Sequence, residues 1–333
     1  MIGREDREVE RVKIAILAIL ADLQSAVGGH VIARRLKNEY GVELSERAVR
    51  YHLKLLDGRG FTNKVSRRDG RSITPQGLEE LKNAMVADKV GFVSDKIELL
   101  AYQASFDIER RTGNVPVNIS IFPKDKFKTA LKEMAGAFKK EMGVSNLVAV
   151  AGEGERLDDM LVPRGCTALA TVCSVIVNGA LLKAGIPMDS RFGGILQLRN
   201  NHPWRFTELI EYAGSSLDPS EIFITSRMTS IGEVLKNGSG KILANFREIP
   251  AVCIPTAEVV FKKLAEAGMD GLIKMGEPGK PVCEMPVGRN KAGVVLIGGL
   301  NPVAAAAEAG IEISNHAMSR LTDYRELKSF WEL

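Results

Sequence analysis

The segment 46–57 (ERAVRYHLKLLD) combines an apolar side with a basic one. Val49, Leu53 and Leu56 recur at i, i+4 and i+7, which indicates a helix with one buried side. The opposite side carries Arg47, Arg50, Tyr51 and Lys54. Arginine forks can pair bidentately with guanine edges, and a tyrosine hydroxyl can reach a phosphate or a base. Preceded by Ser45 as N-cap, the segment is typical of a DNA recognition helix.

A second basic group surrounds a hairpin signal. Asp69-Gly70 is a two-residue turn sequence between two short segments of strand-forming residues. The ribbon that it predicts carries Lys64, Arg67, Arg68 and Arg71 at or near its tip. Such a tip can straddle backbone phosphates, so we expect DNA contacts there. The alternative for both groups is a solvated surface in a domain that docks another protein.

Two later segments resemble each other, 168–186 (ALATVCSVIVNGALLKAGI) and 294–311 (VVLIGGLNPVAAAAEAGI). Each combines an apolar strand, a turn of small residues and a helix, which suggests an internal duplication. Cys173-Ser174 and Gly298-Gly299 would occupy equivalent turns. Free backbone N–H groups at such a turn bind carboxylate or phosphate. The sequence therefore predicts an anion site in a cleft between two related halves.

Side chains near both turns can add donors to this site. Arg191 and Arg289 lie in nearby glycine-bearing stretches and are candidate carboxylate clamps. The candidate effector-binding residues are Thr171, Cys173, Ser174, Arg191, Gly193, Gly194, Arg289, Gly298, Gly299 and Asn301. The alternative for each is a surface arginine, a turn glycine or a buried small residue.

The elements around the basic groups predict one small domain. Helices are expected over 7–24, 30–40, 46–57 and 76–86, with the hairpin before the last of them. Three helices, a basic ribbon and a closing helix resemble a winged helix-turn-helix domain, and 73–81 (ITPQGLEEL) is similar to the segment after the wing in many such regulators. We therefore predict an α+β chain, with a winged helix at 1–88.

The rest of the chain alternates strands and helices. Strands are expected over 115–122 and 146–151, with a helix over 124–142 between them. Residues 89–333 are predicted to form an α/β effector-binding and dimerisation domain with two related halves. The connection 76–103 would carry a change in the cleft to the winged helix.

Composition and charge agree with this division. The 333 residues are 45% apolar and 26% charged, as in globular proteins of two or three cores. Residues 1–75 hold 15 Lys and Arg against 10 Asp and Glu, whereas the remainder holds 30 against 31. All the excess positive charge thus lies on the first quarter, which indicates an anionic partner there, nucleic acid first.

Membrane, metal and secretion signals are weak. The N-terminus is charged where a signal peptide is apolar, so we expect a cytoplasmic protein. The apolar run 167–188 is interrupted by Asn178, Lys183 and Pro187, and we interpret it as a buried strand and helix. The four cysteines lack zinc-site spacing, so buried thiols, no metal and no other cofactor are expected.

A series of short motifs carries a more specific resemblance. In order they are TVCS (171–174), NGALLKAGIP (178–187), SRFGG (190–194), NFREIPA (245–251) and GGLNP (298–302). Together they resemble the effector domain of the nitrogen-responsive repressor family NrpR of methanogenic archaea. The resemblance covers about residues 90–328, and a preceding winged helix is also that family's arrangement.

The resemblance implies a repressor of nitrogen-assimilation genes that 2-oxoglutarate, as effector, releases from double-stranded operator DNA. It also implies a dimer. Some members have two effector domains after one winged helix, whereas this chain has room for one, so a homodimer or a separate effector-domain protein is the expected partner. The resemblance does not fix which residues touch the ligand.

Three alternatives remain open on the residues alone. The first is an enzyme in place of the effector domain, with Cys173 as nucleophile and His202 or His316 as base, although no third partner is recognisable. The second is a regulator that senses another small anion. The third is an adaptor that binds neither DNA nor metabolite. We predict a binding protein rather than an enzyme.

Overall fold

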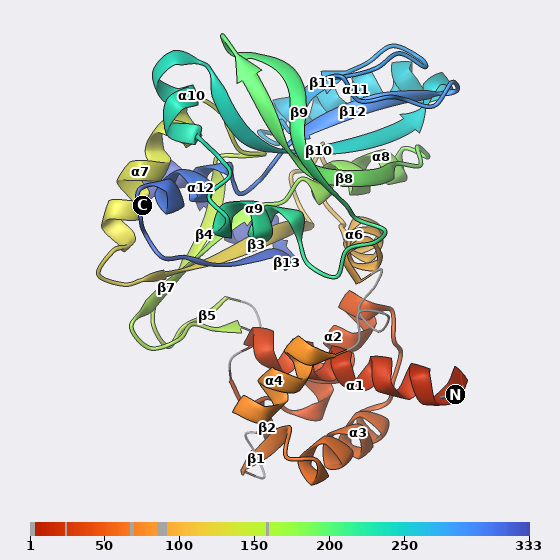
Figure 1. Cartoon of the computed structure of the whole chain (residues 1–333), viewed down its shortest axis with the longest axis vertical. Helices are drawn as coiled ribbons and strands as arrows, with labels where there is room; N and C mark the ends of the chain where they lie inside the picture. The colour runs from red at the N-terminus through yellow and green to blue at the C-terminus, as the bar shows by residue number, and fades with distance from the viewer. Residues whose placement is uncertain (1–3, 24, 67–69, 85–91, 158–159) are drawn as a thin grey trace.

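The computed structural model describes residues 4–23, 25–66, 70–84, 92–157 and 160–333, and Figure 1 shows an N-terminal part below a larger C-terminal part. The predicted boundary between 88 and 89 lies outside the described residues. The N-terminal elements are α1 (Arg4–Leu23), α2 (Gly29–Tyr40), α3 (Glu46–Gly58), β1 (Thr62–Ser66), β2 (Gly70–Ile73) and α4 (Pro75–Asn83).

The N-terminal elements begin and end where local chemistry predicts. The Ser45 hydroxyl accepts a hydrogen bond from the Ala48 N–H at 3.2 Å, and the Thr74 hydroxyl accepts one from Gly77 at 3.0 Å. Gly41 ends α2 with φ +65°, a conformation that favours glycine. Apolar residues of α1, α2 and α3 share a core separate from that of the C-terminal part. The predicted helix order of a winged helix is confirmed.

The C-terminal part contains two five-stranded sheets with helices. Its elements are α6 (Phe92–Gln103), β3 (Asn114–Pro123), α7 (Phe127–Lys139), β4 (Leu147–Ala151), β5 (Arg156–Leu157), β6 (Met160–Leu161), β7 (Cys166–Val172), α8 (Val175–Lys183), β8 (Asp189–Arg199), β9 (His202–Glu211), α9 (Pro219–Thr225), α10 (Ile231–Asn237), β10 (Gly240–Pro250), η1 (Ala251–Cys253), α11 (Ile254–Glu266), β11 (Leu272–Met275), β12 (Lys291–Ile297), α12 (Asn301–Glu308), β13 (Ser314–Asp323), η2 (Tyr324–Glu326), β14 (Lys328–Ser329) and η3 (Phe330–Glu332).

The sheet orders reveal the internal repeat. One sheet runs β13-β3-β7-β4-β14 and the other runs β11-β12-β10-β8-β9, with antiparallel pairing between the described neighbours. The first half is β3-α7-β4-β7-α8 and the second is β10-α11-β11-β12-α12. Each half then sends its next strand, β8 or β13, into the other half's sheet. The mixed fold class and the two related halves are confirmed, and the exchanged strands tie the halves together.

The long apolar run becomes core rather than a membrane segment. β7 is almost fully buried, and α8 is buried on several sides, with Val175, Ile176, Val177 and Leu181 all inside. Among the described residues, no helix has the length and apolar character to cross a bilayer.

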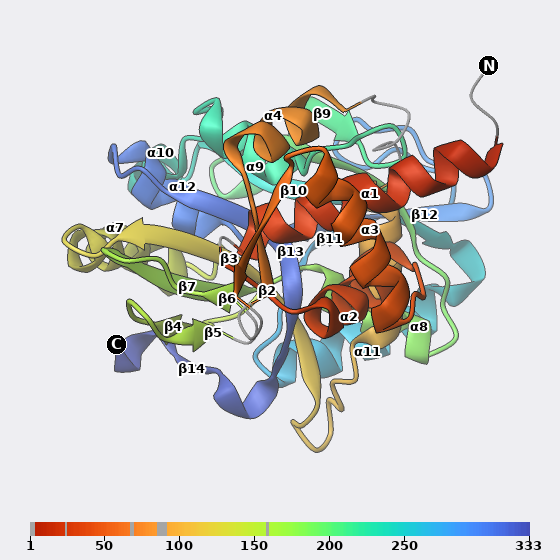
Figure 2. The ribbon, with the colours of Figure 1, turned by 90° about the horizontal axis from the view of Figure 1, so that it is seen from below.

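Helix α6 lies where the two parts meet. It packs against α8 of the C-terminal part and against α2 of the N-terminal part. An ion pair of 3.1 Å joins Arg11 of α1 to Asp95 of α6. Figure 2, seen from below, shows the N-terminal helices in front of β13. The contacts across the junction therefore involve α1 and α2 on the N-terminal side, and α6, β6 and β13 on the C-terminal side.

Gly299 allows the two halves to meet, and its replacement tests that contact. A Cβ at this position would lie 2.4 Å from the Val172 carbonyl oxygen and 2.9 Å from the Asn118 amide nitrogen. Because backbone must shift to make room, Gly299→Ala is expected to lower the free energy of unfolding by about 1–3 kcal/mol. Chemical denaturation measures this. Gly214→Ala, whose Cβ would meet nothing within 4 Å, is the matched control. Equal stability of Gly299→Ala and wild type would contradict the close approach.

Candidate DNA interface and anion cavity

Helix α3 presents its predicted basic side to solvent. Val49, Leu53 and Leu56 are buried in the N-terminal core. The side chains on the opposite side are exposed, namely those of Arg47, Arg50, Tyr51 and Lys54. The guanidinium of Arg50 pairs with Glu46 one turn earlier, but an exposed pair of this kind contributes little and yields easily to a stronger acceptor. The helix can therefore present these side chains to a groove.

The ribbon β1-β2 differs in part from the prediction. Lys64 is exposed on β1, whereas Arg67 and Arg68 lie outside the described residues. Arg71 is not at a free tip, because its Nε lies 2.7 Å from an oxygen of Asp57 and its backbone bridges to Val27. Arg71 thus ties the ribbon to the end of α3, and a phosphate contact would have to share it with Asp57.

A cavity of about 20 Å³ lies between the two halves of the C-terminal domain. The first half contributes Asn118, Cys173, Ser174 and Val175. The second half contributes Asn245, Arg247, Gly299 and Leu300. Tyr212, Asp218, Ser220, Ala317 and Met318 complete the lining from the elements around α9 and β13. Both small-residue turns predicted to bind an anion therefore reach one cavity.

Arg247 is a buried cation in this cavity. Its side chain comes from β10, and only 1% of its surface is exposed. One terminal nitrogen donates to the Ser190 hydroxyl, while its Nε has no hydrogen-bond partner, and within the described part of the chain it forms no ion pair. Burial lowers the pKa of Arg247 from its ordinary value. A buried charge without a counter-charge is costly unless a ligand supplies one.

Hydrogen bonds connect the two halves across the cavity. The Tyr212 hydroxyl donates to the side-chain oxygen of Asn245 at 2.5 Å, and the Asn245 amide nitrogen donates to the Ser174 hydroxyl at 3.1 Å. Gly193 lets Tyr212 approach, since a Cβ there would lie 3.1 Å from its hydroxyl. This chain of donors and acceptors suits a polar ligand that inserts between the halves.

The structure brings some predicted effector-binding residues together and leaves others apart. Cys173, Ser174 and Gly299 line the cavity. Asn301 instead bonds the backbone N–H and carbonyl of Leu243, and the Gly298 N–H donates to the same carbonyl. Both residues therefore fix the turn before α12 onto β10.

The remaining predicted residues lie behind or outside the cavity. Thr171 accepts a 3.5 Å hydrogen bond from Asn118, and Gly194 packs against β9. Arg191 is half exposed near Asp189 and Glu248, and Arg289 is exposed in the loop before β12. Neither arginine lines the cavity, so the cation that does, Arg247, was missed by the sequence prediction.

The thiol and the acid clusters do not suggest catalysis or a metal. Burial raises the pKa of Cys173 to about 11, which keeps its thiol protonated and poorly nucleophilic. Among the described residues, no group of three or more His, Cys, Asp or Glu could hold a metal ion.

A buried acid pair lies beside the cavity on α9. Asp218 caps this helix by accepting hydrogen bonds from the N–H groups of Ser220 and Glu221. Burial raises the pKa of Asp218, and burial together with the Asp218 charge raises the pKa of Glu221 to about 7. Below neutral pH this end of the cavity therefore loses negative charge, which reduces its repulsion of an anion.

The raised pKa of Glu221 predicts a pH-dependent stability. Between its ordinary pKa of 4.5 and about 7, the folded chain binds more protons than the unfolded chain, so stability falls as pH rises through this window. The lowered pKa of Asp22 makes stability depend on pH only at pH values below its ordinary pKa of 3.8. We expect Glu221→Gln to raise the unfolding free energy at pH 8 by about 2 kcal/mol and to flatten its pH dependence. Thermal unfolding from pH 5 to 8 measures this, with the exposed Glu133→Gln as control. The same slope in all three proteins would be the contrary result.

Comparisons with known proteins match both parts of the chain. Residues 90–329 match the family of NrpR regulatory domains NRD1 and 2, and residues 14–81 match the ribonuclease R winged-helix domain. The chain is 39% identical to the global nitrogen regulator NrpRI of Methanosarcina mazei, over 97% of this chain and 99% of that relative.

Two further relatives are longer than this chain. The global nitrogen regulators NrpR of Methanococcus maripaludis and Methanocaldococcus jannaschii are 30% and 32% identical over 95% and 96% of this chain, but only 55% and 56% of their own length is covered. The crystal structure of a nitrogen repressor-like protein from Methanococcus jannaschii is also similar. The two structures superpose with a TM-score of 0.61 at 28% sequence identity. The match covers 72% of this chain and 98% of that chain.

Proposed function

Because the chain belongs to the NrpR family of nitrogen regulators, we propose that it represses nitrogen-assimilation genes and that 2-oxoglutarate releases it from its operator. The winged helix would bind double-stranded DNA, and the C-terminal domain would bind the effector between its two halves. In this proposal the cavity binds a ligand and catalyses no reaction.

The observation that carries the effector proposal is Arg247. It is the buried guanidinium that lines the cavity, and the described structure offers it no carboxylate. A forked guanidinium pairs bidentately with a carboxylate, and the N-terminal end of α8, which has no side-chain cap at Ser174, favours a second negative charge through its helix dipole. A dicarboxylate can use both, one at each half. The wider depression of about 360 Å³ beside β9 suits it less, because none of its lining residues is basic.

The size of the cavity implies movement on binding. About 20 Å³ is roughly the room that one water molecule needs, and a dicarboxylate is larger. We therefore propose that the halves separate on binding, and that side chains such as Tyr212 and Asn245 then exchange partners. A ligand that binds only the opened arrangement shifts the protein toward it, which is the requirement for an allosteric effector.

The experiment that tests this function measures operator binding by fluorescence anisotropy. With promoter DNA of a nitrogen-assimilation gene, 2-oxoglutarate is expected to lower the affinity about tenfold or more. Glutarate, which keeps the five-carbon chain and lacks the keto group, tests whether another dicarboxylate serves equally. Ser174→Trp, whose indole would fill the cavity, should bind operator with an affinity that 2-oxoglutarate does not change. Operator affinity that is indifferent to 2-oxoglutarate in the wild type would refute the proposed response.

We also propose a homodimer on an inverted repeat. One winged helix makes too few base contacts for useful discrimination, and the residues matched here cover only 55% and 56% of the two longer relatives. We expect multi-angle light scattering to give a dimer at micromolar concentration and two chains per operator. A monomer with one chain per operator would favour a separate effector-domain partner instead.

A further inference from the structure

Strand β13 contains an irregularity where it lines the cavity. His316 lies opposite Ile119 and Arg320 opposite Val117, so residues 317–319 face Asn118 alone. Within this bulge, Ala317 and Met318 line the cavity, and Met318 has φ +49°. A side chain other than glycine rarely adopts this conformation, which persists only where the surroundings hold it.

Three polar contacts hold the bulge, and each comes from a different element. The Met318 N–H donates to the side-chain oxygen of Asn118 at 3.0 Å, and the Ala317 N–H donates to Glu221 at 2.6 Å. Lys96 of α6 donates to the Ala317 carbonyl at 3.4 Å. An incoming carboxylate is a strong acceptor and competes for the same N–H groups. Occupancy of the cavity therefore acts directly on the backbone of the bulge.

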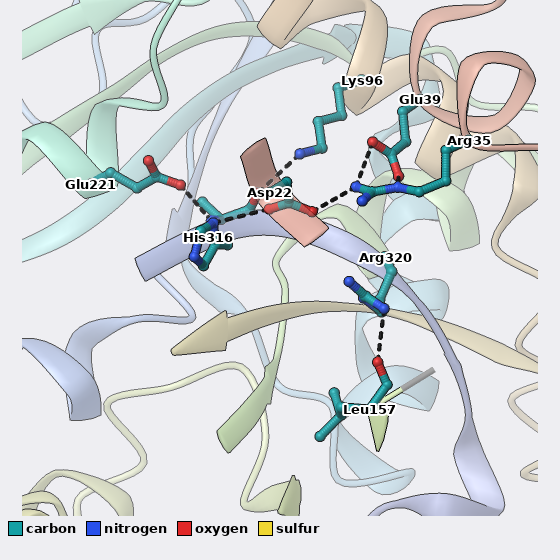
Figure 3. A network of polar contacts seen from close by, with 9 residues as sticks. Asp22, Arg35, Glu39, Lys96, Leu157, Glu221, His316 and Arg320 are labelled. Carbon is teal, nitrogen blue, oxygen red and sulfur yellow. Dashed lines mark hydrogen bonds and ion pairs between the residues drawn. The ribbon is translucent and has the colours of Figure 1, made fainter. Parts of the chain in front are cut away.

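The residue just before the bulge contacts the winged helix. The Nδ1 atom of His316 lies 3.0 Å from one oxygen of Asp22 on α1, as Figure 3 shows. The other Asp22 oxygen lies 2.7 Å from Arg35 of α2, which also pairs with Glu39. Burial works to raise the pKa of Asp22, but the hydrogen bond from His316 and the charge of Arg35 outweigh it and hold the pKa well below its usual range. The carboxylate is thus a charged, partly buried bridge between the two parts.

This bridge bears on the recognition helix. Asp22 and Arg35 join α1 to α2, and α3 packs against both helices in the N-terminal core. A shift at His316 therefore changes how the whole winged helix is held, whereas the Arg11–Asp95 pair between α1 and α6 lies apart and is half exposed. The His316–Asp22 and Arg11–Asp95 contacts both cross the junction, so variants of the second serve as controls for variants of the first.

We propose that the bulge at 317–319 transmits occupancy of the cavity to the winged helix, with His316 as the positioning residue that connects it to Asp22. This inference rests on the proposed function, since 2-oxoglutarate is the occupant it assumes. Ligand binding takes the bulge N–H groups from Asn118 and Glu221, the bulge relaxes, and the hold of His316 on Asp22 is lost.

The test compares operator affinity with and without 2-oxoglutarate in four proteins. Wild type and Asp95→Asn are expected to show the full, about tenfold, loss of operator affinity. His316→Ala should bind 2-oxoglutarate as tightly as wild type, within about threefold. In this variant, however, the addition of 2-oxoglutarate should change the affinity for operator less than twofold. His316→Asn, whose amide nitrogen can take the place of Nδ1, should restore the response. Wild-type coupling in His316→Ala would overturn the proposal.

A second measurement needs no effector. It separates the proposed connection between the bulge and Asp22 from the proposed response to 2-oxoglutarate. Hydrogen exchange of the ligand-free chain should show faster exchange at residues 316–319 in Asp22→Asn, a change made in the other domain, and not in Asp95→Asn. Unchanged exchange in Asp22→Asn would reject the connection. If 2-oxoglutarate binds none of the proteins, the proposed function fails, while this exchange comparison still decides the inference.

Discussion

Replacing Arg247 with methionine is expected to lower the affinity for 2-oxoglutarate about 100-fold, which corresponds to about 3 kcal/mol. Methionine keeps an unbranched stem in the core and removes the guanidinium, so the ligand loses its forked donor and its counter-charge. The variant should fold, since a buried cation without a carboxylate partner is replaced by an apolar group. Calorimetry with 2-oxoglutarate measures the loss, and circular dichroism verifies the fold.

Two further variants make this result specific. Arg247→Lys keeps the charge but not the fork, so its affinity should lie between those of wild type and Arg247→Met. Arg191→Met tests the clamp predicted from the sequence, which lies outside the cavity beside Asp189 and Glu248. A loss in Arg191→Met together with wild-type affinity in Arg247→Met would move the anion site to that surface.

Replacing Arg50 with alanine is expected to cost about 1–3 kcal/mol at the operator, or about 5- to 150-fold in affinity. Its side chain is exposed in the first half of α3, where a recognition helix contacts base edges. Affinity for random DNA should change far less, because base contacts discriminate between sequences and phosphate contacts do not.

The matched variant for this comparison is Lys64→Ala on the ribbon. Lys64 is exposed on β1 and is expected to contact phosphate, so its removal should weaken all sequences alike and lower the salt dependence by about one unit of slope. Competition gel shifts at several salt concentrations distinguish the two patterns. Equal losses on operator and random DNA for Arg50→Ala would show that α3 does not read bases.

Local signals in the sequence were sufficient for the winged helix. Ser45, Thr74 and Gly41 act within one turn of their own position, so their roles follow from residue type and spacing. The pairing of Arg71 with Asp57 could not be predicted, because it depends on how the ribbon folds back onto α3.

The candidate cavity was predictable only in part. The turns at Cys173-Ser174 and at Gly299 were found because the repeated strand-turn-helix pattern marks them, and both line the cavity. Arg247 was missed, although it lies two residues after Asn245 on β10 and a strand places residues at this spacing on the same face. Whether a strand arginine is buried depends on the strand exchange between halves, which is a tertiary property. The bulge in β13 was missed for the same reason, since its partners Asn118 and Glu221 are distant in the sequence.

The most direct measurement is a calorimetric titration of the full chain with 2-oxoglutarate, once alone and once saturated with operator DNA. If effector and operator are coupled, both titrations give binding, and operator lowers the affinity for 2-oxoglutarate by the same factor by which 2-oxoglutarate lowers the affinity for operator. A tenfold factor corresponds to about 1.4 kcal/mol. No binding heat at any temperature, or equal affinities in the two titrations, would contradict a cavity that regulates the winged helix.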